Sequence, residues 1–181
     1  MEATDRSFYT WKDYINWEGR WEIIDGEAYD MSPAPYPKHQ RVVLNIAKKM
    51  TETLKCDECE VFISPIDWRI DDLNVVQPDI AIFCEDTKEQ YFTKTPPLIV
   101  EVLSKSTASK DINEKFYLYE KSGVKFYVIV EPNSEVTDIF ELKDGRYQLQ
   151  KKLTSKDSYS FEFGKCSVEI DFKEVFKEAK G

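Results

Sequence analysis

The stretch Leu98–Leu103, LIVEVL, is apolar except for its glutamate. An unbroken apolar run of this kind predicts a central β-strand that is covered on both faces. Ser106 or Thr107 can cap a helix after it, and Gly123 is suited to end that helix. A second apolar run at 126–130 predicts another buried strand. Strand, helix and strand form a βαβ unit, so we expect two parallel strands joined by a right-handed crossover.

Turn residues and alternating patterns on either side of this unit predict further strands and a long helix. We expect antiparallel hairpins at 21–31 and 136–149, paired strands at 60–64 and 67–70, a strand within 75–84 and a helix from Lys38 to Leu54. The hairpins add antiparallel strands to the parallel pair. The predicted fold is therefore α/β, with a mixed central sheet flanked by helices and extended by antiparallel hairpins.

The length of 181 residues predicts one domain, with a core at about 20–150 and C-terminal strands and a short helix at 151–181. No apolar stretch approaches the roughly 20 residues that span a bilayer, so we expect no membrane partner. The first residues lack the pattern of a secretory signal, and we expect a cytoplasmic protein. The net charge of −9 argues against nonspecific attraction of nucleic acid to the whole surface, but it allows a local basic groove.

Four cysteines are present, and two of them have the C-x-x-C spacing of half a zinc site. These are Cys56 and Cys59, whereas Cys84 and Cys166 stand alone in the sequence. We interpret all four as reduced thiols of a cytosolic protein. A zinc protein nucleated by Cys56 and Cys59 is the alternative.

Two acidic residues sit where a dry core would be expected. Glu101 lies inside the apolar strand, where an unpaired carboxylate costs several kcal/mol, roughly. Asp79 opens the preceding predicted strand directly after Pro78. If the two strands are neighbours, the carboxylates converge and repel unless a divalent cation bridges them. Oxygen ligands favour Mg²⁺ or Mn²⁺, so we predict a metal site at Asp79 and Glu101.

Asp111 and Lys115 lie four residues apart on the helix that follows. Taken singly, they form an ordinary surface ion pair worth about 0.3 kcal/mol. We expect both at the boundary between the apolar stripe Ile112, Phe116 and Tyr119 and the polar surface. Beside two metal-binding acids, the lysine would orient a water molecule and stabilise the charge that develops on a phosphodiester.

Several segments together resemble the Uma-type restriction endonucleases of the PD-(D/E)XK nuclease superfamily. The matching segments are EIIDGEAYDMSPAP, HQRVV, VVQPDIAIF, PPLIVEVLSKST, DINEKFYLYEKSGVKFYVIVEP and DGRYQL, which run from about Trp21 to Leu149. The resemblance implies a restriction-endonuclease-like core, a Mg²⁺ site and nuclease chemistry on nucleic acid, with DNA as the expected substrate. It places Glu27, Asp79, Glu101 and Lys115 at candidate catalytic positions, and His39 and Asp111 at supporting positions.

This chain departs from the superfamily pattern in its lysine. The superfamily lysine follows the second acid by two residues, where this chain has Leu103. In the Uma-type family the lysine is supplied from the next helix, which points to Lys115, while Lys105 is a competitor. The basic pair expected before Asp111 is reduced to Ser109-Lys110. Arg41, near His39 on the predicted helix, is a further residue that could contact phosphate.

Two readings of the family resemblance are left open. One is a Mg²⁺-dependent endonuclease; the alternative is a catalytically inactive nuclease-fold module that binds or regulates as a dimer. The acidic net charge and the weak basic pair favour the alternative. The aromatic residues of the segment 115–121 are crowded for a solvent-facing helix, so we expect a homodimer.

Overall fold

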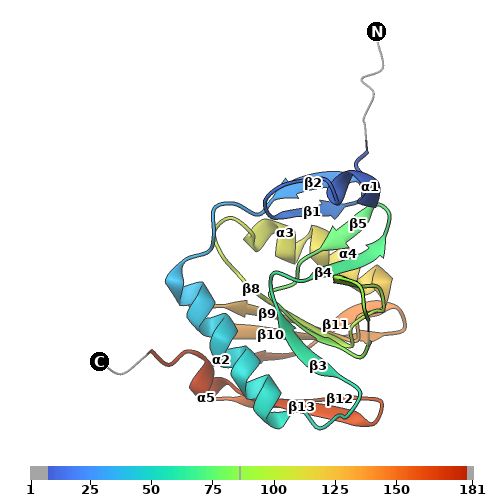
Figure 1. Ribbon diagram of the computed structural model, residues 1–181. Helices are drawn as coiled ribbons and strands as arrows, with labels where there is room; N and C mark the ends of the chain where they lie inside the picture. The colour runs from blue at the N-terminus through green and yellow to red at the C-terminus, as the bar shows by residue number, and fades with distance from the viewer. Residues whose placement is uncertain (1–7, 86, 179–181) are drawn as a thin grey trace.

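The computed structural model describes residues 8–85 and 87–178, and Figure 1 shows how their helices and strands are arranged. The helices are α1 (Trp11–Tyr14), α2 (Pro37–Thr53), α3 (Ala108–Ile112), α4 (Glu114–Ser122) and α5 (Phe172–Val175). The strands are β1 (Trp21–Ile24), β2 (Glu27–Asp30), β3 (Glu60–Ile63), β4 (Asp67–Asp71), β5 (Asn74–Val76), β6 (Ile80–Phe83), β7 (Tyr91–Phe92), β8 (Leu98–Val102), β9 (Phe126–Glu131), β10 (Val136–Lys143), β11 (Arg146–Leu153), β12 (Ser158–Phe163) and β13 (Cys166–Asp171).

A six-stranded sheet in the order β11-β10-β9-β8-β6-β3 carries the predicted βαβ unit. Strands β8 and β9 pair in parallel, with Leu98 opposite Phe126, and their other neighbours β6 and β10 run antiparallel to them. The predicted mixed sheet with added hairpins is confirmed. Strands β6 and β8 are neighbours, as the proposed pairing of Asp79 with Glu101 requires.

A second sheet of five strands, β2-β1-β5-β4-β7, lies above the first in Figure 1. The hairpin of β1 and β2 is confirmed. The predicted pairing of the strands at 60–64 and 67–70 is wrong, because β3 pairs with β6 in the first sheet and β4 pairs with β5 in the second. The chain passes from one sheet to the other between Ile63 and Asp67.

Alternating side chains divide the interior into two cores, one on each face of the six-stranded sheet. Along β8, Leu98, Val100 and Val102 pack with α2 and the β12–β13 hairpin. Ile99 faces the opposite side, where it packs with α4 and the five-stranded sheet. Because side chains alternate along a strand, Glu101 also projects to this second side. The only acid of the LIVEVL run therefore lies between the two sheets.

The predicted helix after β8 is interrupted. It forms α3 and α4, which separate at Asn113, whose side-chain amide donates to the carbonyl of Ser109. Gly123, with φ of 85°, ends α4 as expected. The expectation that Asp111 and Lys115 lie at the polar surface is wrong. Both are 1% exposed, whereas Ile112 of the supposed apolar stripe is 48% exposed.

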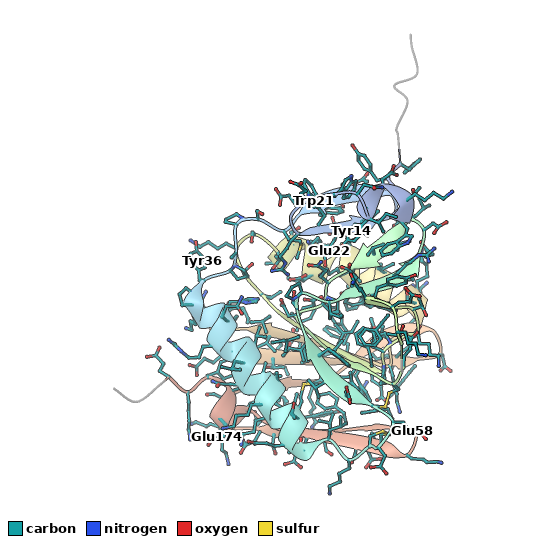
Figure 2. All side chains as sticks on the ribbon, in the orientation of Figure 1. Tyr14, Trp21, Glu22, Tyr36, Glu58 and Glu174 are labelled. Carbon is teal, nitrogen blue, oxygen red and sulfur yellow. A yellow bond between two sulfur atoms is a disulfide. The ribbon has the colours of Figure 1, made fainter. Side chains whose placement is uncertain are left out.

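The expectation of four reduced thiols is also wrong for this structure. Cys56 pairs with Cys166, and Cys59 pairs with Cys84, in two disulfides that are drawn in yellow in Figure 2. The two cysteines that stand alone in the sequence are thus brought to the C-x-x-C pair. Among the residues that the structure describes, no helix has both the length and the apolar character needed to cross a bilayer.

Candidate active site

Asp79 and Glu101 meet at the start of β6. Ile80 pairs with Val100 in the antiparallel ladder, which places the residue before β6 beside the end of β8. The backbone N–H of Val102 donates to Oδ2 of Asp79 at 2.8 Å, and the N–H of Asp79 donates to Oε2 of Glu101 at 3.2 Å. Each carboxylate is therefore held by the backbone of the other strand. The expected convergence of these two acids is present.

Lys115 enters the same cluster from α4. Its Nζ lies 2.9 Å from Oε1 of Glu101 and 3.7 Å from Oδ1 of Asp111. The hydroxyl of Tyr119, one helical turn further on, donates to Oε1 of Glu101 at 2.8 Å. Lys115, Tyr119 and Glu101 are each no more than 2% exposed. The amine and the second acid are thus fixed by direct contacts in a dry environment.

Glu22 is a fourth acid of the cluster that the sequence reasoning missed. It is 0% exposed, and its Oε1 lies 2.8 Å from Nζ of Lys115. Its Oε2 lies 2.6 Å from Nζ of Lys110, and the backbone N–H of Gln77 also donates to its carboxylate. The signal was available, because Glu22 opens the segment EIIDGEAYDMSPAP and lies between Trp21 and the buried Ile23.

Glu27, the acid predicted from the same segment, is exposed at the start of β2. Its carboxylate accepts a hydrogen bond from Tyr29 at 3.4 Å, and no contact among the described residues joins it to the cluster. The structure does not bring Glu27 to the other predicted catalytic residues.

The three supporting basic residues occupy different places. His39, near the start of α2, is 6% exposed, and its Nε2 lies 3.3 Å from Oδ2 of Asp79. Arg41 points to another surface, where it pairs with Glu178 at 3.4 Å. Lys105 is exposed and lines a neighbouring pocket of about 460 Å³ that also includes His39. The structure brings His39 into the cluster and leaves Arg41 and Lys105 outside it.

Negative charge is in excess within this cluster. Burial alone would raise the pKa of Glu22, but Lys115 and Lys110 outweigh it and lower that pKa. Burial of the His39 ring acts to lower its pKa, but the hydrogen bond and charge of Asp79 leave the pKa raised. With His39 protonated, three cations face four carboxylates, which are those of Glu22, Asp79, Glu101 and Asp111.

Asp111 is the acid of the cluster with the fewest hydrogen bonds. Neither of its carboxylate oxygens has a hydrogen-bond partner among the described residues. Burial, opposed in part by Lys115, raises the pKa of Asp111 to about 6. Burial and the neighbouring acids also raise the pKa of Glu101, although Glu101 accepts three hydrogen bonds from Lys115, Tyr119 and the Asp79 backbone. Since hydrogen bonds favour the ionised form, the surplus proton belongs on Asp111.

A small pocket of about 80 Å³ gives access to the cluster beside Asp79, whose side chain is 19% exposed. Arg20, Ser64 and Lys110 line it together with Asp79 and His39. This volume holds several waters, or an ion with its waters, but not a nucleotide. A large substrate would therefore place only its reacting group at the mouth.

The donor set fits a hard divalent cation that retains much of its hydration. The known contacts of Asp79 use Oδ2, so Oδ1 has no protein donor among the described residues. Within 8–85 and 87–178, three acidic or histidine side chains nowhere gather into a single coordination shell. Mg²⁺ is commonly bound through one or two carboxylates and keeps several waters. Asp79 and Glu101 could hold such an ion, and its positive charge would favour the ionised form of the nearby Asp111.

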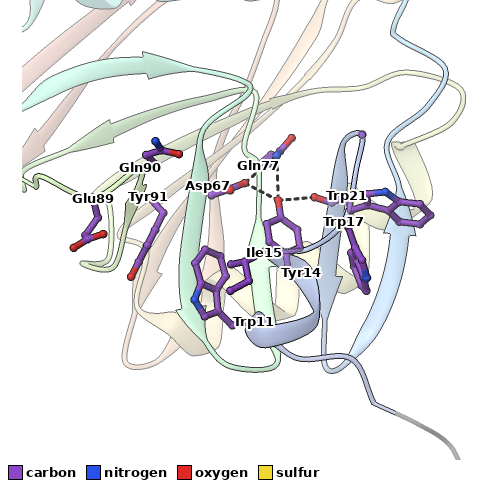
Figure 3. A pocket seen from close by; sticks show the side chains of 11 residues that line it. Trp11, Tyr14, Ile15, Trp17, Trp21, Asp67, Gln77, Glu89, Gln90 and Tyr91 are labelled. Carbon is purple, nitrogen blue, oxygen red and sulfur yellow. Dashed lines mark hydrogen bonds between the residues drawn. The ribbon is translucent and has the colours of Figure 1, made fainter.

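A larger pocket of about 420 Å³, shown in Figure 3, is separate from this cluster. Its wall is largely aromatic, with Trp11, Trp17 and Tyr91 among the lining residues. The hydroxyl of Tyr14 donates to Asp67 at 2.7 Å and to the carbonyl of Trp21 at 3.0 Å. These polar groups satisfy one another, and none of the clustered carboxylates lines this pocket. The acid–lysine cluster is therefore the better candidate for chemistry.

The arrangement combines a mixed sheet, two acids where β6 begins and β8 ends, and a lysine from the second helix after β8. The structure resembles a crystal structure from Anabaena variabilis described as "a putative nuclease belonging to DUF820", with a TM-score of 0.73 and 14% sequence identity over 92% of this chain and 97% of the other. At this identity the likeness shows the fold.

The chain belongs to the Uma2 family, described as "Putative restriction endonuclease", whose model matches residues 7–167. Two proteins of Synechocystis sp. are similar to it. Uncharacterized protein slr1290 is 29% identical over 141 residues, which is 74% of each chain. Uncharacterized protein sll1609 is 30% identical over 103 residues, which is 54% of this chain and 58% of the relative. The family resemblance seen in the sequence is confirmed.

Proposed function

We propose that this protein is a Mg²⁺- or Mn²⁺-dependent endonuclease that hydrolyses phosphodiester bonds of nucleic acid, with DNA as the expected substrate. The observation that carries the proposal is the meeting of Asp79, Glu101 and Lys115 in one cluster that has more carboxylates than cations. Membership of the Uma2 family and the nuclease-like fold support it.

Asp79 and Glu101 are the residues that would hold the metal ion. When bound, such an ion supplies Lewis-acid activation of a phosphodiester and a more acidic water. His39 and the Val102 N–H fix the Asp79 carboxylate, while Lys115 and Tyr119 fix Glu101. These contacts pre-orient the two acids, and pre-oriented charge is more effective than charge that must reorganise during the reaction.

Lys110 and Arg20 are the cations that line the pocket beside Asp79. Lys110 is held by Glu22, and the guanidinium of Arg20 donates to Gln77 and Ser64. Both positive charges are therefore fixed at the mouth, where a phosphate group would approach. Such contacts position a nucleic-acid backbone without reading its sequence.

The test is a cleavage assay on supercoiled plasmid and on RNA, with Mg²⁺, Mn²⁺ or EDTA. We expect nicking that requires the metal and that is lost in Asp79→Asn and Glu101→Gln, because each variant removes a negative oxygen while keeping its shape. Glu27→Gln, at an exposed acid outside the cluster, is the matched control and should cleave like the wild type. Cleavage that persists in Glu101→Gln, or that is unchanged in EDTA, would contradict the proposal.

A catalytically inactive nuclease-fold module is the second candidate, and one observation favours it. Glu101 is 2% exposed and Lys115 is 1% exposed, so solvent reaches the cluster mainly at Asp79. Calorimetry with millimolar Mg²⁺ or Mn²⁺ separates the candidates. Binding that is lost in Asp79→Asn supports the enzyme, whereas the absence of binding in the folded wild type supports the module.

A homodimer stays a prediction, and fewer apolar residues of α4 are exposed to support it than the sequence indicated. Helix α4 buries Leu118 and Tyr119 within its own chain, so its apolar residues are not all available to a partner. Tyr117, at 64% exposure, and Ile112 line an open groove of about 710 Å³ with Phe116 and Phe140. Light scattering on the wild type and on Tyr117→Ser would show whether this groove mediates self-association.

A further inference from the structure

The four cysteines of the chain meet at one place, at the opposite end of β6 from Asp79. Cys56 lies in the loop after α2, Cys59 directly precedes β3, Cys84 directly follows β6, and Cys166 opens β13. Figure 2 shows the sulfurs near the lower edge of the molecule, close to Glu58. No part of the proposed nuclease chemistry uses them.

The backbone places these cysteines together independently of any bond between the sulfurs. The β3–β6 ladder pairs Glu60 with Phe83, so the next residues outward, Cys59 and Cys84, also face each other. An isolated bridge pairs Lys55 with Ser167, and its two backbone hydrogen bonds measure 2.8 and 3.3 Å. This bridge brings Cys56 beside Cys166. The gathering of four thiol side chains is thus a property of the fold.

Three of the four sulfurs are close enough to share one metal ion, and the fourth is bonded to one of them. Those of Cys56, Cys59 and Cys166 all lie within 4.8 Å of one another, and the sulfur of Cys84 is bonded to that of Cys59. A tetrahedral zinc site with Zn–S bonds of about 2.3 Å has sulfurs about 3.8 Å apart. Cys56 and Cys59 have the two-residue spacing that is common in such sites. After reduction, rotation of the Cys84 side chain toward the other three sulfurs would complete a Cys₄ shell.

We infer that the reduced form of this protein binds one Zn²⁺ through Cys56, Cys59, Cys84 and Cys166. The disulfide form and the zinc form are two ways of satisfying the same four sulfurs. Two equivalents of a dithiol reductant convert the two disulfides into four thiols and are themselves oxidised to cyclic disulfides. Binding of Zn²⁺ by the four thiols then releases four protons, and no further electron transfer is needed.

The position of the cluster indicates a structural zinc site. Structural sites are closed by four protein ligands, whereas catalytic sites leave one position for water. Cys56 comes from the loop after α2, Cys59 and Cys84 from the β3–β6 edge of the six-stranded sheet, and Cys166 from the separate β12–β13 hairpin. A bound ion would therefore tie the C-terminal hairpin to the sheet in a compartment where disulfides are reduced.

The experiment uses the full chain, expressed without a histidine tag and purified under a phosphine reductant that keeps thiols reduced. Elemental analysis should find about one zinc per chain after gel filtration, and intact mass should show four thiols once the metal is removed. Cobalt exchanged into the site should give thiolate-to-metal charge-transfer and tetrahedral absorption bands. This spectrum identifies sulfur ligands in the wild type without any mutation.

Matched variants locate the ion. Cys84→Ser and Cys166→Ser should each lose most of the zinc, because each removes one thiolate from a different segment. Glu58→Gln, an exposed residue of the same loop, should keep it. Glu101→Gln should also keep it, which separates this site from the carboxylate cluster.

Two outcomes would overturn the inference. One is a folded wild type that contains no zinc after incubation with Zn²⁺ under the reductant. The other is full zinc content in a Cys84→Ser/Cys166→Ser double variant, which would place the ion elsewhere. A protein that stays four hydrogens lighter than the thiol form under the reductant, without zinc, would give the first result and assign the cysteines to permanent disulfides.

Discussion

Oε1 of Glu22 lies 2.8 Å from Nζ of Lys115, and these side chains are 0% and 1% exposed. The pair joins β1 of the five-stranded sheet to α4 on the face of the six-stranded sheet. Buried charges are tolerated where they are paired, and removing one partner leaves an uncompensated charge in a medium of low polarity. Glu22 is therefore required both for the fold and for the charge state of the candidate site.

The first prediction concerns Glu22→Gln, which keeps the shape of the side chain and removes its charge. We expect the free energy of unfolding to fall by about 3 kcal/mol, because Lys110 and Lys115 both lose a close counter-ion. Glu27→Gln, at an exposed acid on the paired strand, should change it by less than about 0.5 kcal/mol. Urea denaturation measures both. Equal effects of the two variants would show that Glu22 has no special role.

The second prediction compares two buried tyrosines. The hydroxyl of Tyr119 donates to Glu101 at 2.8 Å, and that of Tyr127 donates to the backbone carbonyl of Asp111 at 2.7 Å. Tyr119→Phe and Tyr127→Phe should each cost about 1–2 kcal/mol of stability. Only Tyr119→Phe should also weaken Mg²⁺ binding and cleavage, because only that hydroxyl orients a proposed metal ligand. Identical metal affinity in the two variants would argue against Glu101 as a ligand.

The third prediction concerns pH in the metal-free protein. The pKa of Asp111 is about 6 in the fold, against 3.8 ordinarily, so between these values the native state binds more protons than the unfolded state. The contribution of Asp111 to the free energy of unfolding therefore falls as pH rises through this window. In Asp111→Asn this contribution is absent. The free energy of unfolding of the variant, minus that of the wild type, should therefore rise by about 2–3 kcal/mol between pH 4 and pH 7.

Urea denaturation in EDTA at several pH values measures this difference. Glu114→Gln removes an exposed carboxylate from the same segment and serves as a contrast, because an exposed side chain has nearly the same surroundings in the folded and unfolded states. A difference between Asp111→Asn and the wild type that does not change with pH would mean that Asp111 is ionised throughout.

The sequence was sufficient for the βαβ unit, whereas the meeting of Asp79 with Glu101 was predicted only on the condition that their strands are neighbours, which the structure shows. The βαβ unit follows from local patterns, since two apolar runs joined by a capped helix specify neighbours along the chain. The sequence was not sufficient for the partners of β3 and β4. Their pairing depends on which sheet each strand joins, and neighbouring strands in the sequence usually pair with each other, so the local rule gave the wrong answer.

The burial of Lys115 and the identity of the fourth acid required the three-dimensional structure. An Asp and a Lys four residues apart on a helix predict an exposed ion pair, because such pairs are common on exposed helices. Here the five-stranded sheet covers that face of α4 and brings Glu22 to it from far along the chain. The gathering of the four cysteines likewise depends on a bridge between residues 55 and 167.

The fourth prediction decides which lysine serves the chemistry. Lys115 contacts Glu101, and Lys110 lines the pocket beside Asp79. Lys105 is exposed and lines the neighbouring pocket, which also includes His39. We expect Lys115→Met and Lys110→Met to lower the cleavage rate by a factor of about 100 or more, because each removes a fixed positive charge near the reacting phosphate. Lys105→Met should cleave within about twofold of the wild type, since its charge is solvated and mobile.

Stability must be measured beside activity, because Lys115 and Lys110 both pair with the buried Glu22. Assays at a temperature where circular dichroism shows each variant to be folded separate lost chemistry from lost structure. If Lys105→Met were inactive and folded Lys115→Met were active, the amine would come from the loop after β8. The buried ion pair of Lys115 with Glu22 would then serve only the stability of the fold, and Asp79 and Glu101 would act without Lys115.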